Sequence, residues 1–226
     1  ASASFDDYDV VIAPMLHVVP DALRTRLEAV VRGGRHLITT FFSGIVDEHD
    51  RVWLGGYPGA LRDLLGITVE EFVPLLPDAP VRLVSGAAAT QWTERIVRVG
   101  VDAEVLDTYA DGDLAGAPAV PRRRVGDGTA TYVSADLGRD GVRALIERLA
   151  ADTVALQAHP LAADGRLEVI VREASEQRFV FLANRTDEPV VAATEAGEVE
   201  VAPRAVVVLA GTQVLTADPR REVVPA

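Results

Sequence analysis

One short stretch of the sequence gathers groups that can bind a metal ion or transfer protons. Asp47, Glu48, His49 and Asp50 follow one another directly. Carboxylate and imidazole groups are common metal ligands and general acids or bases. Adjacent residues in a loop point in different directions, however, whereas a metal ion or a substrate needs convergent side chains. We therefore interpret this stretch as a solvated turn, and we predict neither a metal site nor a catalytic group there.

Nucleophilic and cofactor chemistry have few other candidates. The chain has neither cysteine nor lysine, which excludes disulfides, thiolate metal sites and Schiff-base chemistry within it. Ser43, Ser85 and Ser134 lie outside any Gly-x-Ser-x-Gly motif and have no identifiable His/Asp pair. His17 has no partner at a motif spacing, so we interpret it as structural. The glycine-rich stretch 55–59 lacks the lysine of a phosphate-binding loop, and the sequence predicts no cofactor.

The overall charge narrows the class of partner. A net charge of −12 argues against binding to nucleic acid or to anionic lipid. The one dense basic run, Arg122 to Arg124, is interpreted as a solvated loop. No apolar run approaches the roughly 18 residues needed to cross a bilayer, and the first residues do not resemble a signal peptide. We expect a cytoplasmic protein, and its arginine-rich, lysine-free composition suggests a GC-rich genome.

The first half of the chain alternates strands and helices. The apolar run 8–14 predicts a buried strand, and the Leu and Val residues of 20–33, ended by two glycines, predict a helix. A second strand over 36–42 completes a right-handed βαβ unit. A long ordered loop follows, then a short helix from Pro58 to Gly66 and a strand over 67–72. This order predicts an α/β domain built on a parallel sheet.

The second half is richer in strands. Runs at 95–99 and 103–107 predict a β-rich insertion, and Gly126-Asp127-Gly128 predicts a hairpin between 122–125 and 129–134. A helix is expected from about Asp140. Short, evenly spaced runs then predict a small antiparallel β-sandwich; they are 167–172, 178–184, 190–194, 199–201 and 205–209, with turns at 175–176, 186–189 and 196–197.

Several of these stretches closely resemble one enzyme family. The block FFSGIVDEHDRVWLGGYPGALRDLLGITVEEF is the most specific, with YDVVIAPMLHVV before it and ATYVSADLG and FVFLANRTDEPV after it. They resemble the middle, trimerisation domain and the C-terminal β-domain of glycoside hydrolase family 42 β-galactosidases. The resemblance implies a trimerisation domain over 1–156, incomplete at its N-terminal end, a linker over 157–164, a small β-domain over 165–211 and a tail over 212–226, where Val214 and Leu215 are expected to dock.

The resemblance also sets expectations about catalysis and fold. The family hydrolyses β-galactosides with retention, using two carboxylates on a (β/α)₈ barrel of about 250 residues. This chain matches the other two domains, so we expect the barrel to be absent, no catalytic residue here, and a fragment of a longer enzyme. The middle domain resembles flavodoxin-like or class I glutamine amidotransferase-like folds, but those amidotransferases need a cysteine that this chain lacks.

The functional hypothesis is a non-catalytic region that assembles a β-galactosidase. Its partners would be further copies of itself, in a trimer, and the missing barrel. Phe41, Phe42, Trp53 and Tyr57 are the candidate interface residues, because large aromatic groups dominate interface energetics. For Phe41 and Phe42, burial in the domain core is the favoured alternative. For Trp53 and Tyr57 the two interpretations are balanced.

Two hypotheses from other classes remain. One is a stand-alone carbohydrate-binding or structural module that presents aromatic rings from the small β-domain; Phe179 and Phe181 share one strand face, and we assign them to the core. The other, less favoured, is a cysteine-free hydrolase on an amidotransferase-like scaffold that uses one of the three serines.

Overall fold

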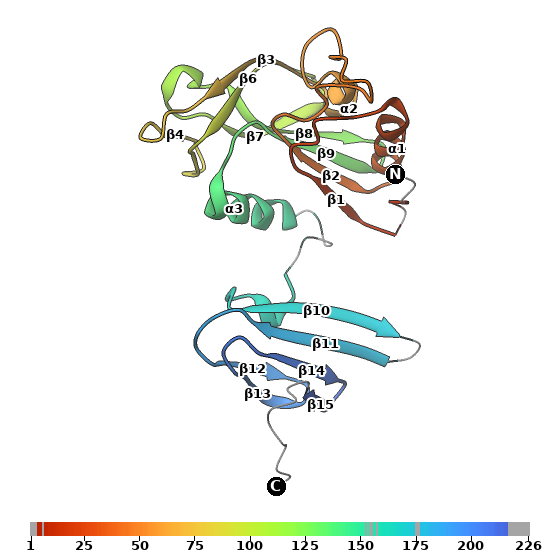
Figure 1. Cartoon of the computed structure of the whole chain (residues 1–226), viewed down its shortest axis with the longest axis vertical. Helices are drawn as coiled ribbons and strands as arrows, with labels where there is room; N and C mark the ends of the chain where they lie inside the picture. Colours follow the sequence, from red (N-terminus) through yellow and green to blue (C-terminus); the bar gives the residue numbers. More distant parts are fainter. Residues whose placement is uncertain are drawn as a thin grey trace. The chain divides into compact units, whose positions relative to one another are not determined.

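The computed structural model describes residues 4–216, except residues 6, 152, 154, 155, 157, 175 and 176 (Figure 1). The predicted turn at 175–176 and the tail beyond residue 216 therefore lie outside the described residues. The chain divides into two units, Ala1–Leu156 and Gln157–Ala226. In the described part of the chain, no helix combines the length and the apolar character needed to cross a membrane.

A five-stranded mixed sheet forms the centre of the first unit, in the order β1-β2-β9-β8-β7. Its strands are β1 (Val10–Ala13), β2 (His36–Thr40), β7 (Ala103–Thr108), β8 (Pro118–Val125) and β9 (Gly128–Val133). β1, β2 and β9 are parallel, whereas β8 and β7 are antiparallel to their neighbours. The predicted parallel sheet is thus correct for three strands. The hairpin joining β8 to β9 reverses the chain direction and makes the sheet mixed.

Helices cover both faces of this sheet. Successive residues of a strand point to opposite faces, and accordingly Leu37 and Ile38 lie in different buried clusters. On the face of Leu37 lies α1 (Asp21–Arg32), which buries Leu27 and Val31. On the face of Ile38 lies α3 (Gly138–Ala150), whose Leu149 is buried. The apolar stripe of α1 therefore faces the sheet, and so does that predicted for α3, except for Val142, which is exposed.

The remaining elements of the first unit surround this sheet. A 3₁₀ turn, η1 (Gly59–Leu61), continues into α2 (Arg62–Leu65), and Gly66 ends it with a φ of 68°, as predicted. The antiparallel pair β3 (Ile67–Pro74) and β6 (Trp92–Val99) follows, with register shifts near Val69. The other short elements are β4 (Val81–Arg82), β5 (Ala88–Ala89) and η2 (Gly112–Leu114).

The basic run Arg122 to Arg124 lies within β8, so the interpretation of it as a solvated loop is wrong. Arg122 pairs with Glu104 at 2.7 Å and Arg123 with Asp102 at 2.6 Å. Acidic side chains on and beside the neighbouring strand β7 thus offset this basic run. Arg122 and Arg123 thus pair within the unit, and Arg124 is exposed.

The second unit consists of antiparallel strands, as expected. A four-stranded sheet has the order β10-β11-β14-β15, beside the hairpin β12-β13. The strands are β10 (Leu167–Ala174), β11 (Gln177–Asn184), β12 (Val190–Thr194), β13 (Gly197–Val201), β14 (Val206–Ala210) and β15 (Gln213–Thr216), preceded by η4 (Pro160–Ala162). Val214 and Leu215, expected to dock, belong to β15, which pairs with β14.

The core of the second unit lies between the sheet and the hairpin. Val180 and Leu182 of β11 belong to this core, with Leu209 of β14. Phe179 and Phe181 alternate with them, so they share one strand face, as predicted, but it is the opposite face. Assigning these two rings to the core is therefore wrong, and both are half-buried on the outer face of the sheet.

Candidate interaction surface

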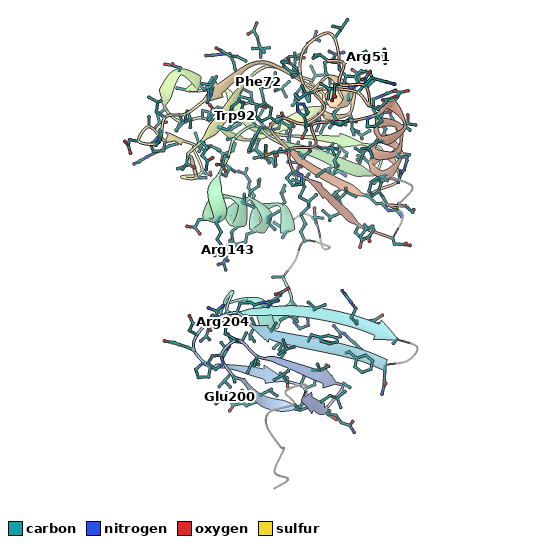
Figure 2. The ribbon with its side chains drawn as sticks, viewed as in Figure 1. Arg51, Phe72, Trp92, Arg143, Glu200 and Arg204 are labelled. Carbon is teal, nitrogen blue, oxygen red and sulfur yellow. The ribbon has the colours of Figure 1, made fainter. Side chains whose placement is uncertain are left out.

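Five aromatic side chains from four segments of the first unit form one cluster, which we call the aromatic cluster. They come from the end of β2, the loop before η1, and the paired strands β3 and β6, and they are Phe41, Phe42, Tyr57, Phe72 and Trp92. All five are half-buried. Figure 2 labels Phe72 and Trp92, whose ring centroids lie 5.8 Å apart across the β3–β6 pair.

The rings of the aromatic cluster contact one another in a continuous series. The centroid of Phe42 lies 4.2 Å from that of Trp92 and 5.1 Å from that of Phe72. Tyr57 stacks on Phe72 at 4.7 Å, and Phe41 stacks on Trp92 at 6.3 Å. These separations are typical of favourable aromatic pairs. The sequence placed Phe41, Phe42 and Tyr57 in one block, and the structure brings these three together.

A buried carboxylate holds two members of the aromatic cluster in place. Glu94 has no exposed surface. Its Oε1 accepts hydrogen bonds from the backbone N–H of Phe42 at 3.1 Å and from the indole N–H of Trp92 at 3.5 Å. Its Oε2 accepts a hydrogen bond of 2.6 Å from the hydroxyl of Tyr132. Burial raises the pKa of Glu94, and the three hydrogen bonds partly oppose that shift.

The backbone at Phe42 is held in a conformation that bulky residues rarely adopt. Its φ is 61°, in the left-handed region, which costs of order 1–3 kcal/mol for a residue with a side chain. Neighbouring contacts hold the loop there: Thr39 Oγ1 lies 2.8 Å from Ala13 O and 2.7 Å from Ser43 Oγ. Ser43 Oγ also accepts the N–H of Leu16 at 3.0 Å. The two loops that follow β1 and β2 are thus joined.

Trp53 lies apart from the aromatic cluster. It packs against the core beneath α1 and α2, and it makes no ring contact with the cluster among the described residues. Its Nε1 is buried without a hydrogen-bond partner in the described part of the chain. A Cβ at Gly59 would lie only 2.2 Å from Trp53 Cβ, so the indole needs a glycine beside it. Trp53 therefore stabilises the loop from within the unit.

Phe72 and Trp92 are the two residues of the cluster that sequence reasoning missed. Both lie in or next to runs predicted as strands, but nothing local indicated that 67–72 and 95–99 pair with each other. In the structure Phe72 is opposite Glu94, and Trp92 lies two residues before Glu94 on the same face. Recognising that pairing would have placed both rings beside Phe42.

The acidic turn has a local structural role. Asp47 Oδ1 accepts the backbone N–H groups of His49 at 2.8 Å and Arg51 at 3.0 Å, and Oδ2 accepts Arg51 Nε at 2.9 Å. These backbone hydrogen bonds, more than the Arg51 charge, lower the pKa of Asp47. One ligand atom from each of Asp47, Glu48 and His49 lies within 4.8 Å of the others. The carboxylate of Asp47 is nevertheless committed to the turn.

The candidate serines do not form a nucleophilic site in the described part of the chain. Ser43 and Ser134 are fully buried. Ser134 Oγ lies 2.8 Å from the hydroxyl of Tyr109 and donates to Ala119 O at 2.9 Å. Burial raises the pKa of Tyr109 to about 12, so this hydroxyl is no base. Ser85 accepts the N–H of Ala87 at 3.4 Å. No hydrogen bond joins these serines to a histidine among the described residues.

His17 is exposed, and its carbonyl accepts the backbone N–H groups of Ile45 and Val46. These bonds hold the loop after β1 against the loop after β2. These bonds do not involve the imidazole, so the structural interpretation of the His17 side chain stays a prediction.

Comparison with known proteins connects this surface to a family. The family described as "Beta-galactosidase trimerisation domain" matches residues 1–156, which contain the whole aromatic cluster. The family described as "Beta-galactosidase C-terminal domain" matches residues 166–211, which contain most strands of the second unit. Two matches therefore account for nearly the whole chain, in the order in which the units occur.

Relatives and solved structures agree with these matches. A β-galactosidase from Arthrobacter sp. is 40% identical over 187 residues, which cover 82% of this chain and 26% of that protein. The β-galactosidase LacZ of Heyndrickxia coagulans is 38% identical over 221 residues, covering 91% of this chain and 33% of that protein. The crystal structure of β-galactosidase from Bacillus circulans sp. alkalophilus superposes with a TM-score of 0.82 at 29% identity, covering 93% of this chain and 34% of that one.

The chain therefore spans only about a third or less of the length of the relatives that it matches. Within that part, the family matches, the sequence identity and the superposition agree with one another. They confirm the resemblance seen in the sequence: the chain belongs to the glycoside hydrolase family 42 β-galactosidases, of which it represents the trimerisation and C-terminal domains.

Proposed function

We propose that the first unit joins subunits of a β-galactosidase into a trimer and that the aromatic cluster is part of the contact surface. The observation that carries this proposal is the continuous series of five half-buried rings on one unit. The description of the matching family, which names trimerisation, supports it. Phe41, Phe42 and Tyr57 are the predicted contact residues that lie in this series, and Phe72 and Trp92 extend it.

The physical reason is preorganisation. Association costs the entropy of fixing side chains, and rings that are already held lose less of it. Before any partner arrives, buried Glu94 accepts a hydrogen bond from the indole N–H of Trp92, which holds that ring, and one from the backbone N–H of Phe42, which holds the backbone that carries the second ring. Trp53, the fourth residue predicted for the interface, contributes indirectly in this proposal, because it supports the loop that carries Tyr57.

We propose further that the full-length protein hydrolyses terminal β-D-galactosides with retention, using a catalytic barrel that this chain does not contain. The names of the relatives support the substrate class, and the fraction of their length that is matched supports the placement of catalysis elsewhere. In this proposal the barrel is the second partner of the chain, and the enzyme works in a bacterial cytoplasm. The finer likeness of the first unit to a flavodoxin-like or amidotransferase-like fold stays a prediction.

Solution mass tests the assembly proposal. We expect light scattering over a concentration series to show a trimer, without β-galactosidase activity in the same sample. Phe41→Ser and Tyr57→Ser should each weaken association about 30-fold, because truncating a central interface side chain costs about 2 kcal/mol. Each variant is compared with the unmodified chain at matched concentrations.

Val101→Ser is the matched control. Val101 is an exposed apolar residue in the turn between β6 and β7, away from the aromatic cluster. Its replacement should leave the mass profile unchanged. A chain that stays monomeric at every concentration, or a Val101→Ser effect equal to that of the two ring variants, would refute the role of the cluster. Measurable galactoside turnover by the chain would refute the placement of catalysis on the barrel.

A further inference from the structure

A cavity of about 270 Å³ opens in the second unit, between η4, the sheet and the β12–β13 hairpin. Its apolar walls come from Leu161, Val180 and Leu209. Sites for drug-sized ligands are typically about 300–1,000 Å³. This cavity therefore suits a ligand the size of a single ring.

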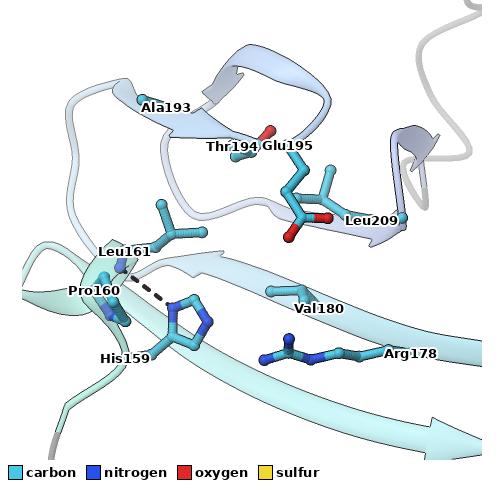
Figure 3. Close-up of a pocket in the computed structure, with 10 residues that line it drawn as sticks. His159, Pro160, Leu161, Arg178, Val180, Ala193, Thr194, Glu195 and Leu209 are labelled. Carbon is cyan, nitrogen blue, oxygen red and sulfur yellow. Dashed lines mark hydrogen bonds between the residues drawn. The ribbon is translucent and has the colours of Figure 1, made fainter.

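Polar groups converge on the same space from separate elements. Figure 3 shows Glu195, from the turn between β12 and β13, and Arg178, from β11, directed into the cavity from opposite walls, with His159 beside them. Neither Arg178 nor Glu195 has an ion-pair partner among the described residues. One donor group and one acceptor group thus remain available to a ligand.

A hydrogen bond at His159 fixes which nitrogen faces the ligand. His159 Nδ1 accepts the backbone N–H of Leu161 at 3.3 Å, at the start of η4. In the neutral imidazole the other nitrogen, Nε2, then carries the proton and donates. The cavity therefore offers two donor side chains and one carboxylate acceptor, above an aliphatic wall.

The balance of charge selects the class of ligand. The positive charge of Arg178 and the negative charge of Glu195 offset each other. An anion would be repelled by Glu195, and a cation would be repelled by Arg178. A neutral polyhydroxyl ring satisfies both, because each hydroxyl can donate and accept. Its C–H groups can pack on Val180 and Leu209. This choice of ligand rests on the β-galactosidase activity proposed above, because hydrolysis of a galactoside releases a hexose.

We propose that this cavity in the second unit is a monosaccharide-binding site, with Arg178, Glu195 and His159 as its hydrogen-bonding groups. It is distinct from the aromatic cluster and does not depend on the assembly of subunits. Bound hexose contacts only residues of the second unit.

Nuclear magnetic resonance of the 226-residue chain titrated with D-galactose tests the proposal. We expect saturable shifts of the backbone amides of Leu161, Val180, Thr194 and Leu209. Arg178→Ala and Glu195→Gln should each weaken binding at least tenfold. Both residues are exposed, so both variants should fold, and the amide signals of the second unit that lie away from the cavity check this directly.

Phe181→Ala is the matched control, because Phe181 lies on the opposite face of the same sheet. It should bind galactose as the unmodified chain does. If Phe181→Ala abolishes the shifts and the two cavity variants keep them, the sugar binds the outer face of the sheet and the proposal is overturned. Absence of saturable shifts, or tighter binding of the zwitterion glycine than of galactose, would overturn it as well.

Discussion

The carboxylate of Glu94 is surrounded by donors and has no cationic partner among the described residues. Tyr132, the Phe42 backbone and Trp92 each donate to it. A buried charge without a counter-ion is expensive, so burial raises the pKa of Glu94, although its three hydrogen bonds favour the charged form. The same side chain bonds the indole of Trp92 and the backbone of Phe42, which joins the protonation of one residue to the geometry of the proposed interface.

Stability of the first unit should therefore depend on pH through Glu94. Its pKa in the folded chain is raised, mainly by burial, so the folded state holds this proton more tightly than the unfolded state. The resulting stabilisation is fully present below the unfolded pKa and is lost as pH rises through the folded pKa. A tenfold difference in proton affinity corresponds to about 1.4 kcal/mol.

Glu94→Gln isolates this contribution, because glutamine keeps the size and an acceptor oxygen but does not titrate. Urea unfolding of both proteins between pH 4.5 and 8 should show the variant gaining stability relative to the unmodified chain as pH rises. Other titrating groups affect both proteins equally and cancel in the difference. Parallel pH profiles would show that folding does not raise the pKa of Glu94.

At the scale of elements, the β8–β9 hairpin is packed against the end of α1. Gly128 begins β9, and a Cβ there would lie 2.1 Å from Arg35 O and 2.2 Å from Val31 O. Both neighbours are backbone atoms, which cannot rotate away. Glycine is thus the residue that allows the hairpin, the helix end and β2 to approach one another.

Gly128→Ala should destabilise the first unit by about 3 kcal/mol or more, since the clash requires the backbone to move. Urea unfolding followed by tryptophan fluorescence measures the loss. Gly116→Ala is the comparison: nothing lies within 4 Å of its added Cβ, although its φ is 83°. Its cost should stay near the roughly 1–2 kcal/mol of a left-handed conformation. Equal losses in the two variants would contradict the packing argument.

The sequence predicts an element well where residues close together in the chain determine it, and poorly where contacts between distant segments determine it. Local signals sufficed for α1, for the Gly66 helix end and for the β8–β9 turn. The direction of β7 and β8 relative to β2, and the pairing of β3 with β6, depend on contacts between distant segments. The aromatic cluster was only partly predicted for this reason, because Phe72 and Trp92 reach it through that pairing.

β11 shows a second limit of sequence patterns. Phe179-Val180-Phe181-Leu182 is apolar at every position, so alternation cannot tell which face is inward. Val180 and Leu182 meet the hairpin β12–β13, and the two phenylalanines face outward. Which face of β11 packs against the hairpin can be told only once the register of the strands is known.

At the scale of the whole molecule, each unit has its own apolar core. Two buried clusters lie within residues 1–156, and a third lies within the second unit. Both tryptophans, Trp53 and Trp92, belong to the first unit. Tryptophan fluorescence therefore reports on the first unit alone, whereas circular dichroism reports on both.

Leu182→Ala should separate the two signals. Leu182 is fully buried in the core of the second unit, and replacing such a leucine by alanine costs about 2–5 kcal/mol. We expect the circular dichroism transition to broaden toward lower urea while the fluorescence midpoint stays unchanged. Leu61→Ala, in the core of the first unit, is the reciprocal variant and should lower the fluorescence midpoint. A fluorescence shift in Leu182→Ala would show that the units unfold as one.

The parallel pairing of β2 with β9 also has a consequence for synthesis. His36 lies opposite Thr129, 93 residues later in the chain. At roughly 5–20 residues per second, a ribosome needs roughly 5–20 s to make that segment. During this interval Leu37 and Ile38, both buried in the finished unit, have β1 beside them but lack β9. The nascent chain thus exposes one unpaired edge of β2 for seconds, although β1 can already pair with the other edge, and we expect chaperones that act during translation to bind it.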